Sequence, residues 1–270
     1  MQCNDSGRWR AMVEQKRVPM AEADPYVLFG LLGKRVIHPG GRQATEKLLE
    51  LAALAPGQQV LDIGCGVGTT AIDMANRYGV TVSAADISPD MRDRAIANVR
   101  SAGVGDRVSV EAADICALPY DDGRFDRVVA EAVTMFVDRD RAISELVRVC
   151  RPGGLVLATE FQWRRPPTPA AHHAFLGEVC PGMLFETVED WLARYGSAGL
   201  IDIEAKTGPF EMMTVRGFLS DEGLGNAVRV MARAMTNGDA RRRMTWMMPR
   251  IARAVPYLGY VVIRGLRPAG

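Results

Sequence analysis

No stretch of the 270-residue sequence approaches the roughly 18 uninterrupted apolar residues that indicate a membrane-spanning helix. The first residues are polar and lack the apolar segment of a secretory signal. The five cysteines are scattered, with no C-x-x-C pair and no metal-ligand spacing, which indicates reduced thiols. We therefore expect a cytoplasmic protein without a membrane span and without a bound metal.

An excess of charge of one sign is also lacking. Lys and Arg number 33 and Asp and Glu number 32, which leaves a net charge of +1. This balance removes the global electrostatic reason to expect nucleic acid or an anionic membrane as a partner, although it allows a local patch. The arginine-rich stretch 241–253 is such a patch in the sequence, and a solvated helix face is its default interpretation.

From residue 58 onward, apolar strand patterns alternate with helical patterns of about 10 to 15 residues. The predicted strands cover 58–64, 80–86, 107–114, 125–132 and 155–161, and the helices between them cover 69–79, 88–102 and 138–150. Because consecutive parallel strands require a crossover, this alternation predicts an α/β fold with a doubly wound, mostly parallel sheet. The later sequence predicts an irregular proline-rich segment, a helix ending near Gly196, a strand at 201–210 and a mostly helical segment at 215–253.

The strongest chemical signal is V-L-D-I-G-C-G-V-G-T-T at 60–70, at a predicted strand-to-helix junction. Gly64, Gly66 and Gly68 allow a sharp turn and close approach of a ligand to the main chain. Their spacing is G-x-G-x-G, whereas the dinucleotide fingerprint needs its third glycine where Thr69 stands. Asp62 precedes the loop and suits a cationic ligand end better than a pyrophosphate.

Two further carboxylates end the next two predicted strands. Asp86 lies 22 residues after Gly64, at the position from which a carboxylate accepts hydrogen bonds from ribose hydroxyls. Asp114 can accept a hydrogen bond from an adenine amino group, with Ile115 and Met91 beside the ring. Because the carboxyl ends of parallel strands meet at one edge of the sheet, the sequence predicts a nucleoside site there.

The chain resembles the class I S-adenosylmethionine-dependent methyltransferases, especially the small-molecule branch that includes the ubiquinone and menaquinone biosynthetic enzymes. The matching blocks are VLDIGCGVG (60–68), AADIS (84–88), AADICALPYDDGRFDRVV (112–129) and ELVRVCRPGGLVLATE (145–160). The resemblance implies S-adenosylmethionine as cofactor and a Rossmann-like sheet of seven strands. The last strand, at 258–267, would be antiparallel.

The resemblance also implies roles for residues. Asp62 and the loop backbone would hold the methionine part, Asp86 the ribose, and Asp114 with Ile115 the adenine. The full expected set of cofactor contacts is Asp62, Gly64, Cys65, Gly66, Gly68, Asp86, Ile87, Met91, Asp114, Ile115 and Glu131. The expected organisation is an N-terminal extension and lid helix at 1–41, a cofactor-binding core at 42–160, an acceptor-side cap interleaved with core elements at 161–256, and a final strand and tail at 257–270.

Methyl transfer requires a positioned nucleophile and exclusion of water, so no obligatory catalytic signature follows. Three residues are candidates for an active-site role. Glu131 follows the fourth predicted strand, His38 lies in the I-H-P-G-G loop, and Tyr26 lies on the predicted lid helix. A surface histidine and a packing tyrosine are equally compatible interpretations of the last two.

The segment 161–256 is rich in methionine and aromatic residues, which suits a small apolar acceptor. We therefore expect methyl transfer to a small molecule rather than to nucleic acid. Methylene transfer to a lipid and a non-catalytic module that binds S-adenosylmethionine are the alternatives. Neither the acceptor atom nor the oligomeric state can be inferred from the sequence.

Overall fold

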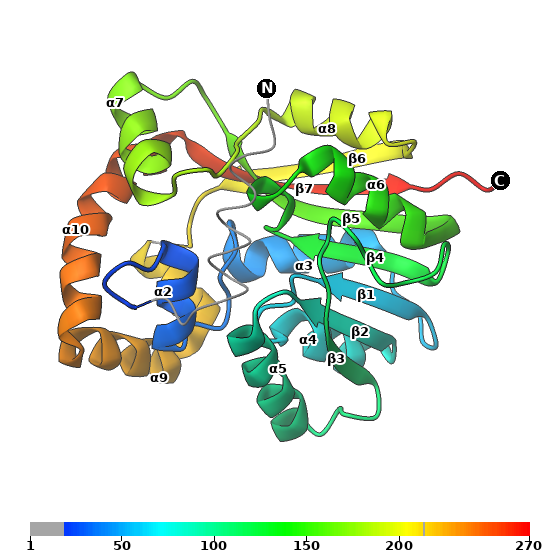
Figure 1. Ribbon diagram of the computed structural model, residues 1–270, viewed down its shortest axis with the longest axis horizontal. Coiled ribbons are helices and arrows are strands. Elements are labelled where there is room, and N and C mark those ends of the chain that lie inside the picture. The colour runs from blue at the N-terminus through cyan, green and yellow to red at the C-terminus, as the bar shows by residue number, and fades with distance from the viewer. Residues whose placement is uncertain (1–18, 213) are drawn as a thin grey trace.

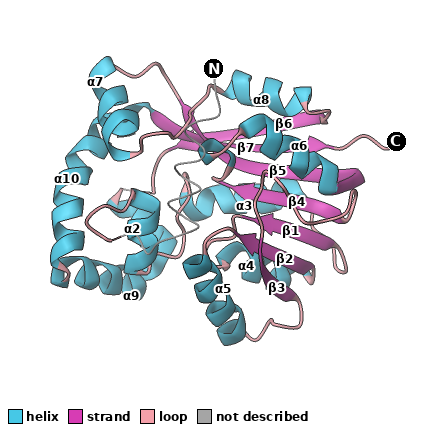
Figure 2. Cartoon of the chain, viewed as in Figure 1, coloured by secondary structure: helices cyan, strands magenta, loops and turns pink. Residues whose placement is uncertain are grey.

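The computed structural model describes residues 19–212 and 214–270 and contains a seven-stranded sheet (Figures 1 and 2). Residues 1–18 of the expected N-terminal extension lie outside the described part. The strands are β1 (Gln59–Ile63), β2 (Thr81–Asp86), β3 (Val108–Ala112), β4 (Phe125–Glu131), β5 (Cys150–Trp163), β6 (Ile201–Pro209) and β7 (Leu258–Leu266). No helix in the described part is long and apolar enough to cross a bilayer.

The strand order is β3-β2-β1-β4-β5-β7-β6. Strands β1 to β5 pair in parallel, and β7 is antiparallel to both of its neighbours, β5 and β6. This confirms the predicted doubly wound sheet and its antiparallel last strand. The order reverses between β2, β1 and β4, so the carboxyl ends of β1 and β4 border the crevice in which open α/β sheets bind ligands.

Helices cover both faces of the sheet. The helices are α3 (Gly41–Ala52), α4 (Thr69–Tyr78) and α5 (Pro89–Ala102) on one face, and α6 (Arg139–Val149) and α8 (Val188–Ser197) on the other. Side-chain caps mark the starts of α5, α6 and α8, whereas α3 and α4 begin after a glycine. The Ser88 hydroxyl accepts the Met91 N–H at the start of α5, with Pro89 in the first turn, as its sequence predicted.

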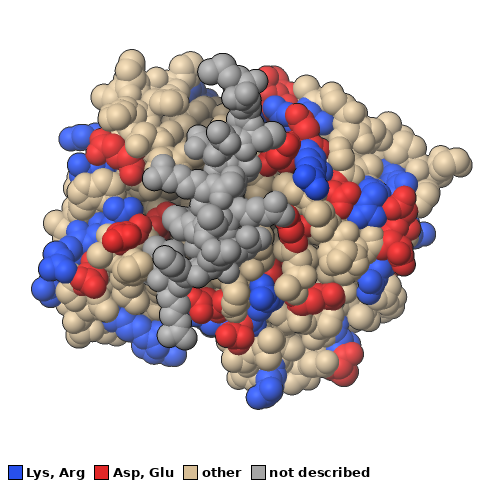
Figure 3. Space-filling view, viewed as in Figure 1, with Lys and Arg blue, Asp and Glu red and all other residues tan. Residues whose placement is uncertain are grey.

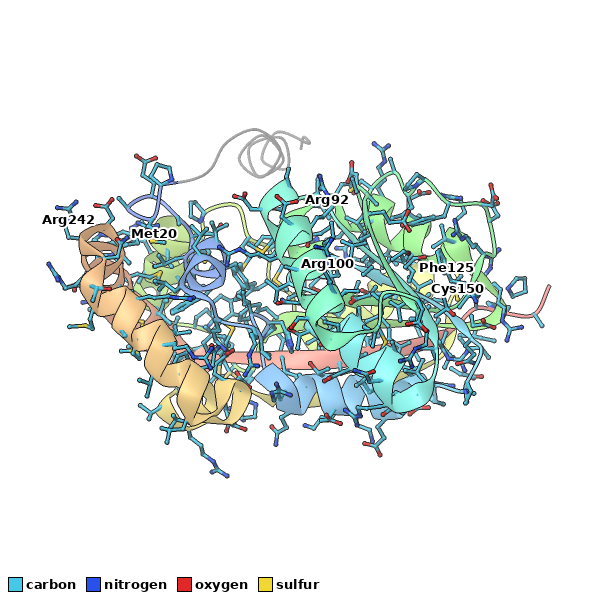
Figure 4. All side chains as sticks on the ribbon, turned by 90° about the horizontal axis from the view of Figure 1, so that it is seen from below. Met20, Arg92, Arg100, Phe125, Cys150 and Arg242 are labelled. Atoms are coloured by element: carbon cyan, nitrogen blue, oxygen red, sulfur yellow. The ribbon has the colours of Figure 1, made fainter. Side chains whose placement is uncertain are left out.

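The remaining helices form a cap beside the carboxyl ends of the strands, at the left of Figure 1. They are α2 (Pro25–Leu32), η1 (Thr134–Phe136), α7 (Pro169–His172), η2 (His173–Val179), α9 (Val215–Thr236), α10 (Gly238–Ala254) and η3 (Val255–Tyr257). In Figure 4, Met20 and Arg242 lie at the cap end of the molecule, opposite Phe125 and Cys150. Apolar side chains from all the cap helices except the short α7 pack into one cluster with Phe161 of β5.

Two local predictions need correction. The proline-rich segment predicted to be irregular contains α7, because the Thr168 hydroxyl accepts the Ala171 N–H and Pro169 stands in the first turn. The strand predicted at 155–161 begins earlier, because β5 already pairs with β4 at Cys150 and passes through an irregularity of register before Leu155. Gly153, with φ 73°, allows the backbone to bend there.

A buried ion cluster joins the loop after α2 to the cap. The Lys34 ammonium lies 3.2 Å from an Asp221 oxygen and 3.5 Å from a Glu222 oxygen, and the side chains are 0%, 4% and 0% exposed. Glu222 also accepts the backbone N–H groups of Arg35 and Val36. The next residue of α9, Gly223, has φ 68° and ψ 158°, a conformation essentially restricted to glycine.

Lys34→Met should strongly destabilise the protein, because it leaves Asp221 buried without its cation and leaves Glu222 paired only with the half-exposed Arg35. Removing one partner of a buried ion pair costs about 3–5 kcal/mol, so we expect a loss of that order in the free energy of unfolding. Urea unfolding followed by circular dichroism measures it.

The control is Arg77→Met, which breaks the surface pair between Arg77 and Glu46, with side chains 41% and 54% exposed. Exposed pairs contribute less than about 1 kcal/mol. Equal losses in the two variants would contradict a structural role for the buried cluster.

Candidate active site

A cavity of about 90 Å³ lies at the carboxyl ends of β1 and β4. Its walls come from the loop after α2 at 35–38, the start of α3, the glycine loop, and Glu131 at the end of β4. The structure therefore brings together six of the predicted site residues, which line this cavity: His38, Asp62, Gly64, Cys65, Gly66 and Glu131.

The three loop glycines all have positive φ, at 75°, 54° and 79° for Gly64, Gly66 and Gly68. A Cβ on Gly64 would lie 2.3 Å from a methyl of Val133, so close packing against Val133 requires glycine at this position. A Cβ on Gly66 would meet nothing within 4 Å, although Gly66 lines the cavity. The backbone at Gly66 is therefore open to a ligand.

The carboxyl group of Asp62 is buried, and one of its two oxygens is available to a ligand. The backbone N–H of Ala71 hydrogen-bonds the carboxyl, but within the described chain Oδ2 is buried and has no hydrogen-bond partner. Burial raises the pKa of Asp62 well above its usual range, and the nearby negative charges of Glu131 and Asp86 raise it further. A cationic ligand group would satisfy this oxygen and stabilise the ionised carboxylate.

Asp86 holds the glycine loop against the end of β2. One carboxylate oxygen accepts the Gly66 N–H at 2.9 Å and the other accepts the Ser88 N–H at 2.8 Å. Arg92, labelled on α5 in Figure 4, donates to the Asp86 carbonyl. Burial raises the pKa of the Asp86 carboxyl, and these hydrogen bonds and Arg92 oppose the rise.

The residues predicted at the adenine lie beyond the cavity walls. Asp114 accepts the Cys116 N–H at 3.0 Å, and Ile115 is buried in the core on the α6 side of the sheet. Met91 lies against Gly30, so α2 covers this part of α5. The Ile87 carbonyl oxygen accepts a hydrogen bond from the Arg92 guanidinium at 2.8 Å.

Glu131 is the centre of a polar network that sequence reasoning found only in part. Its two oxygens accept hydrogen bonds from the Thr45 hydroxyl of α3 at 3.0 Å and the Thr70 hydroxyl of α4 at 2.7 Å. His38 Nε2 lies 3.0 Å from Thr45 Oγ1 and 3.5 Å from Glu131 Oε2. Thr70 was visible within the glycine motif, whereas nothing in the sequence near Thr45 indicated a role.

The contact with Thr45 favours a hydrogen on Nε2 of His38, whereas the contact of Nδ1 with the Pro39 carbonyl needs a hydrogen on Nδ1. The Thr45 hydroxyl has a single hydrogen and donates it to Glu131, so its oxygen must accept a hydrogen from His38 Nε2. In the neutral ring the lone pair is therefore on Nδ1. That atom lies 3.4 Å from the Pro39 carbonyl, which can accept a hydrogen bond once Nδ1 is protonated. A ring with hydrogens on both nitrogens satisfies both contacts: its Nδ1 faces the Pro39 carbonyl and its Nε2 lies beside the Glu131 carboxylate.

Tyr26 lies away from this network, in an aromatic cluster. Its ring packs edge-on against Phe136 at 5.2 Å and Phe161 at 6.4 Å between centroids. Its hydroxyl is buried without a hydrogen-bond partner in the described chain, and burial raises the pKa of that hydroxyl. Phe161 also stacks on Phe185 at 4.7 Å and contacts Phe210 at 5.3 Å.

Comparison with known proteins agrees with this geometry. A family model described as a methyltransferase domain matches residues 60–154. The 27-O-demethylrifamycin SV methyltransferase of Amycolatopsis mediterranei is 32% identical over 234 residues, 83% of this chain and 82% of its own. Norajmaline N-methyltransferase of Rauvolfia serpentina is 33% identical over 210 residues, 67% of this chain and 72% of its own.

The fold is also shared with solved structures. A methyltransferase from Thiobacillus denitrificans, solved with S-adenosyl-L-homocysteine, superposes with a TM-score of 0.71 at 19% identity, over 93% of this chain and 100% of that one. The fold and the strand-end site define a Rossmann-like enzyme that uses S-adenosylmethionine. The chain belongs to the class I S-adenosylmethionine-dependent methyltransferases.

The residues present fit this cofactor. The spare oxygen of Asp62 suits the ammonium of the methionine part, and the open backbone at Gly66 allows close approach. Asp86 stands at the strand end from which ribose hydroxyls are bound in such folds.

Asp62→Asn should weaken S-adenosylmethionine binding and stabilise the ligand-free protein. Loss of a hydrogen bond to a charged group costs about 1.5–3 kcal/mol, so we expect an increase in Kd of about 10- to 150-fold by calorimetry.

The stability effect has a definite sign. Folding raises the pKa of Asp62, so its ionisation costs stability, and that cost grows as pH rises through the folded-state pKa. As the pH rises from mildly acidic to alkaline, the melting temperature of the Asn variant should therefore fall less than that of wild type. An unchanged Kd would contradict the ammonium assignment.

Proposed function

We propose that this methyltransferase transfers a methyl group to a hydroxyl of a small apolar acceptor, with His38 as the general base. The observation that carries the proposal is the network of His38, Thr45 and Glu131 at the cavity, which leaves Nδ1 as the proton-accepting nitrogen. A hydroxyl is a poor nucleophile until its proton is removed, so this acceptor makes most use of such a base.

Each residue contributes a separate function. Bound S-adenosylmethionine supplies an activated methyl group for in-line displacement. Asp62 and the loop backbone would bind its methionine part, and Asp86 its ribose. His38 accepts the acceptor proton at Nδ1, and Glu131 stabilises the charge that then develops on the ring. The cap excludes water from the reacting groups.

The aromatic cluster around Phe161 supports the binding of an apolar acceptor beside the cavity. Phe136 belongs to η1, directly after Glu131 and its strand, and Phe161 belongs to the carboxyl end of β5. This cluster therefore adjoins the strand ends that border the cavity. We propose that the cap within 161–256 binds the acceptor here and that the Tyr26 hydroxyl hydrogen-bonds to the bound acceptor or to the methionine carboxylate.

The names of the relatives agree with a small-molecule acceptor. One acts on 27-O-demethylrifamycin SV, by its name, and another on norajmaline, so oxygen and nitrogen acceptors both occur among similar chains. The histidine network favours oxygen for this chain. A quinol acceptor, as in the ubiquinone branch, has the aromatic ring and hydroxyl that the cluster suits, and it stays a prediction.

His38→Gln should reduce methyl transfer to a hydroxyl acceptor by about 10²–10⁴-fold, the usual contribution of a general base. The affinity for S-adenosyl-L-homocysteine, measured by calorimetry, should remain close to that of wild type. Acceptors would be found by screening small phenols, alcohols and matched amines with a labelled methyl donor. Glu131→Gln should lower the same rate by a smaller factor.

The matched control is His173→Gln, because the His173 side chain is 74% exposed on the cap. A panel in which only amines are methylated, or a His38 variant as fast as wild type, would contradict the proposal. Asp86→Ala should abolish cofactor binding. Wild type that binds the cofactor but methylates none of the panel would favour a binding module instead.

A further inference from the structure

Helix α9 presents two apolar faces. Ala227, Val230 and Ala234 are buried against the rest of the cap. The second face is a stripe that points to solvent, and its members are Leu224 (73% exposed), Val228 (58%), Met231 (45%) and Met235 (58%). Their spacings of four, three and four residues place them along one side of the helix. We call this set the α9 stripe.

Helices α9 and α10 together carry an excess of positive charge. Residues 214–257 contain eight arginines and only three carboxylates, an excess of five positive charges in a chain whose net charge is +1. Two of the three carboxylates, Asp221 and Glu222, are buried against Lys34. Figure 3 shows Lys and Arg gathered along the edge where Figure 1 places α9 and α10. Arg242 and Arg250 pair with Asp239 and Glu178, but two other arginines lie beside the stripe: the exposed Arg229 follows Val228, and the exposed Arg241 donates a hydrogen bond to the Met235 carbonyl. The surface beside the stripe is therefore both apolar and cationic.

A second copy of the chain does not fit this surface well. A two-fold contact would place the patch against itself, so that exposed arginines such as Arg229 and Arg241 would meet arginines. A stable interface also needs about 20–30 residues a side, whereas the stripe has four. A partner for this surface must instead carry negative charge and offer a shallow apolar layer that the stripe can enter.

We propose that the α9 stripe and its arginines dock the protein on an anionic membrane surface. Apolar side chains of one helix face enter the boundary between headgroups and acyl chains, and arginines beside them pair with anionic headgroups. Helix α9 lies along the outer edge of the molecule in Figure 4, so a flat surface can reach it. This proposal does not depend on the acceptor or on methyl transfer.

The test is co-sedimentation of the full chain with vesicles of phosphatidylcholine alone and of phosphatidylcholine mixed with phosphatidylglycerol. We expect binding to the anionic vesicles that weakens with added salt, and little binding to the neutral ones. The double variant Leu224→Gln, Val228→Gln should reduce binding by about tenfold or more, because it removes two inserted apolar side chains. Arg229→Gln with Arg241→Gln should reduce it and lessen its salt dependence.

The matched control is Ile96→Gln with Ile201→Gln, which changes two apolar side chains, 42% and 46% exposed, on α5 and β6. It should bind as wild type does, and circular dichroism should show that all variants are folded. Equal binding to both vesicle types, or anionic binding unaffected by the stripe variant, would overturn the proposal. So would a dimer in sedimentation equilibrium that the stripe variant converts to a monomer.

Discussion

The contact between Lys34 and the two carboxylates of α9 fixes the cofactor pocket and the cap in one arrangement. Because the ammonium and both carboxylates are almost fully buried, separating the loop from α9 would leave bare charges in an apolar surrounding. Such a pair adds little net stability over apolar packing, but it tolerates few alternative geometries. The adjacent residues Arg35 and His38 thereby reach the cavity in a defined position.

Glu131 likewise links several elements, here at the carboxyl edge of the sheet. One carboxylate at the end of β4 accepts hydrogen bonds from α3 and α4 and faces His38 from the loop. Its charge, together with Asp86, opposes ionisation of Asp62. The ligand-free site therefore holds more negative charge than is favourable, and a cationic cofactor relieves it. Such a cost to stability is expected where affinity for a positive ligand is required.

The fold was predictable from the sequence because its signals are local. The alternation of strands and helices predicted the sheet, and carboxylates at strand ends pointed to Asp62, which lines the cavity, and to Asp86, which holds the glycine loop. The contact between Lys34 and Asp221 was not predictable, since 187 residues separate them and each residue, taken alone, is typical of a charged residue at the surface. Thr45 was missed for the same reason, because it meets Glu131 only after α3 packs on the sheet. In contrast, the Thr168–Pro169 signal of α7 was present and was outweighed by the neighbouring prolines.

Gly223 separates two parts of α9 with different surroundings. Before it, Asp221 and Glu222 face inward to Lys34; after it, the α9 stripe faces outward. An uninterrupted helix advances about 100° per residue and would fix the direction of one set by that of the other. The glycine conformation removes that coupling, so the inner end can satisfy buried charges while the outer end exposes apolar side chains. The kink thus lets one helix both hold the loop 34–36, which leads into the cavity wall, and present a surface to a partner.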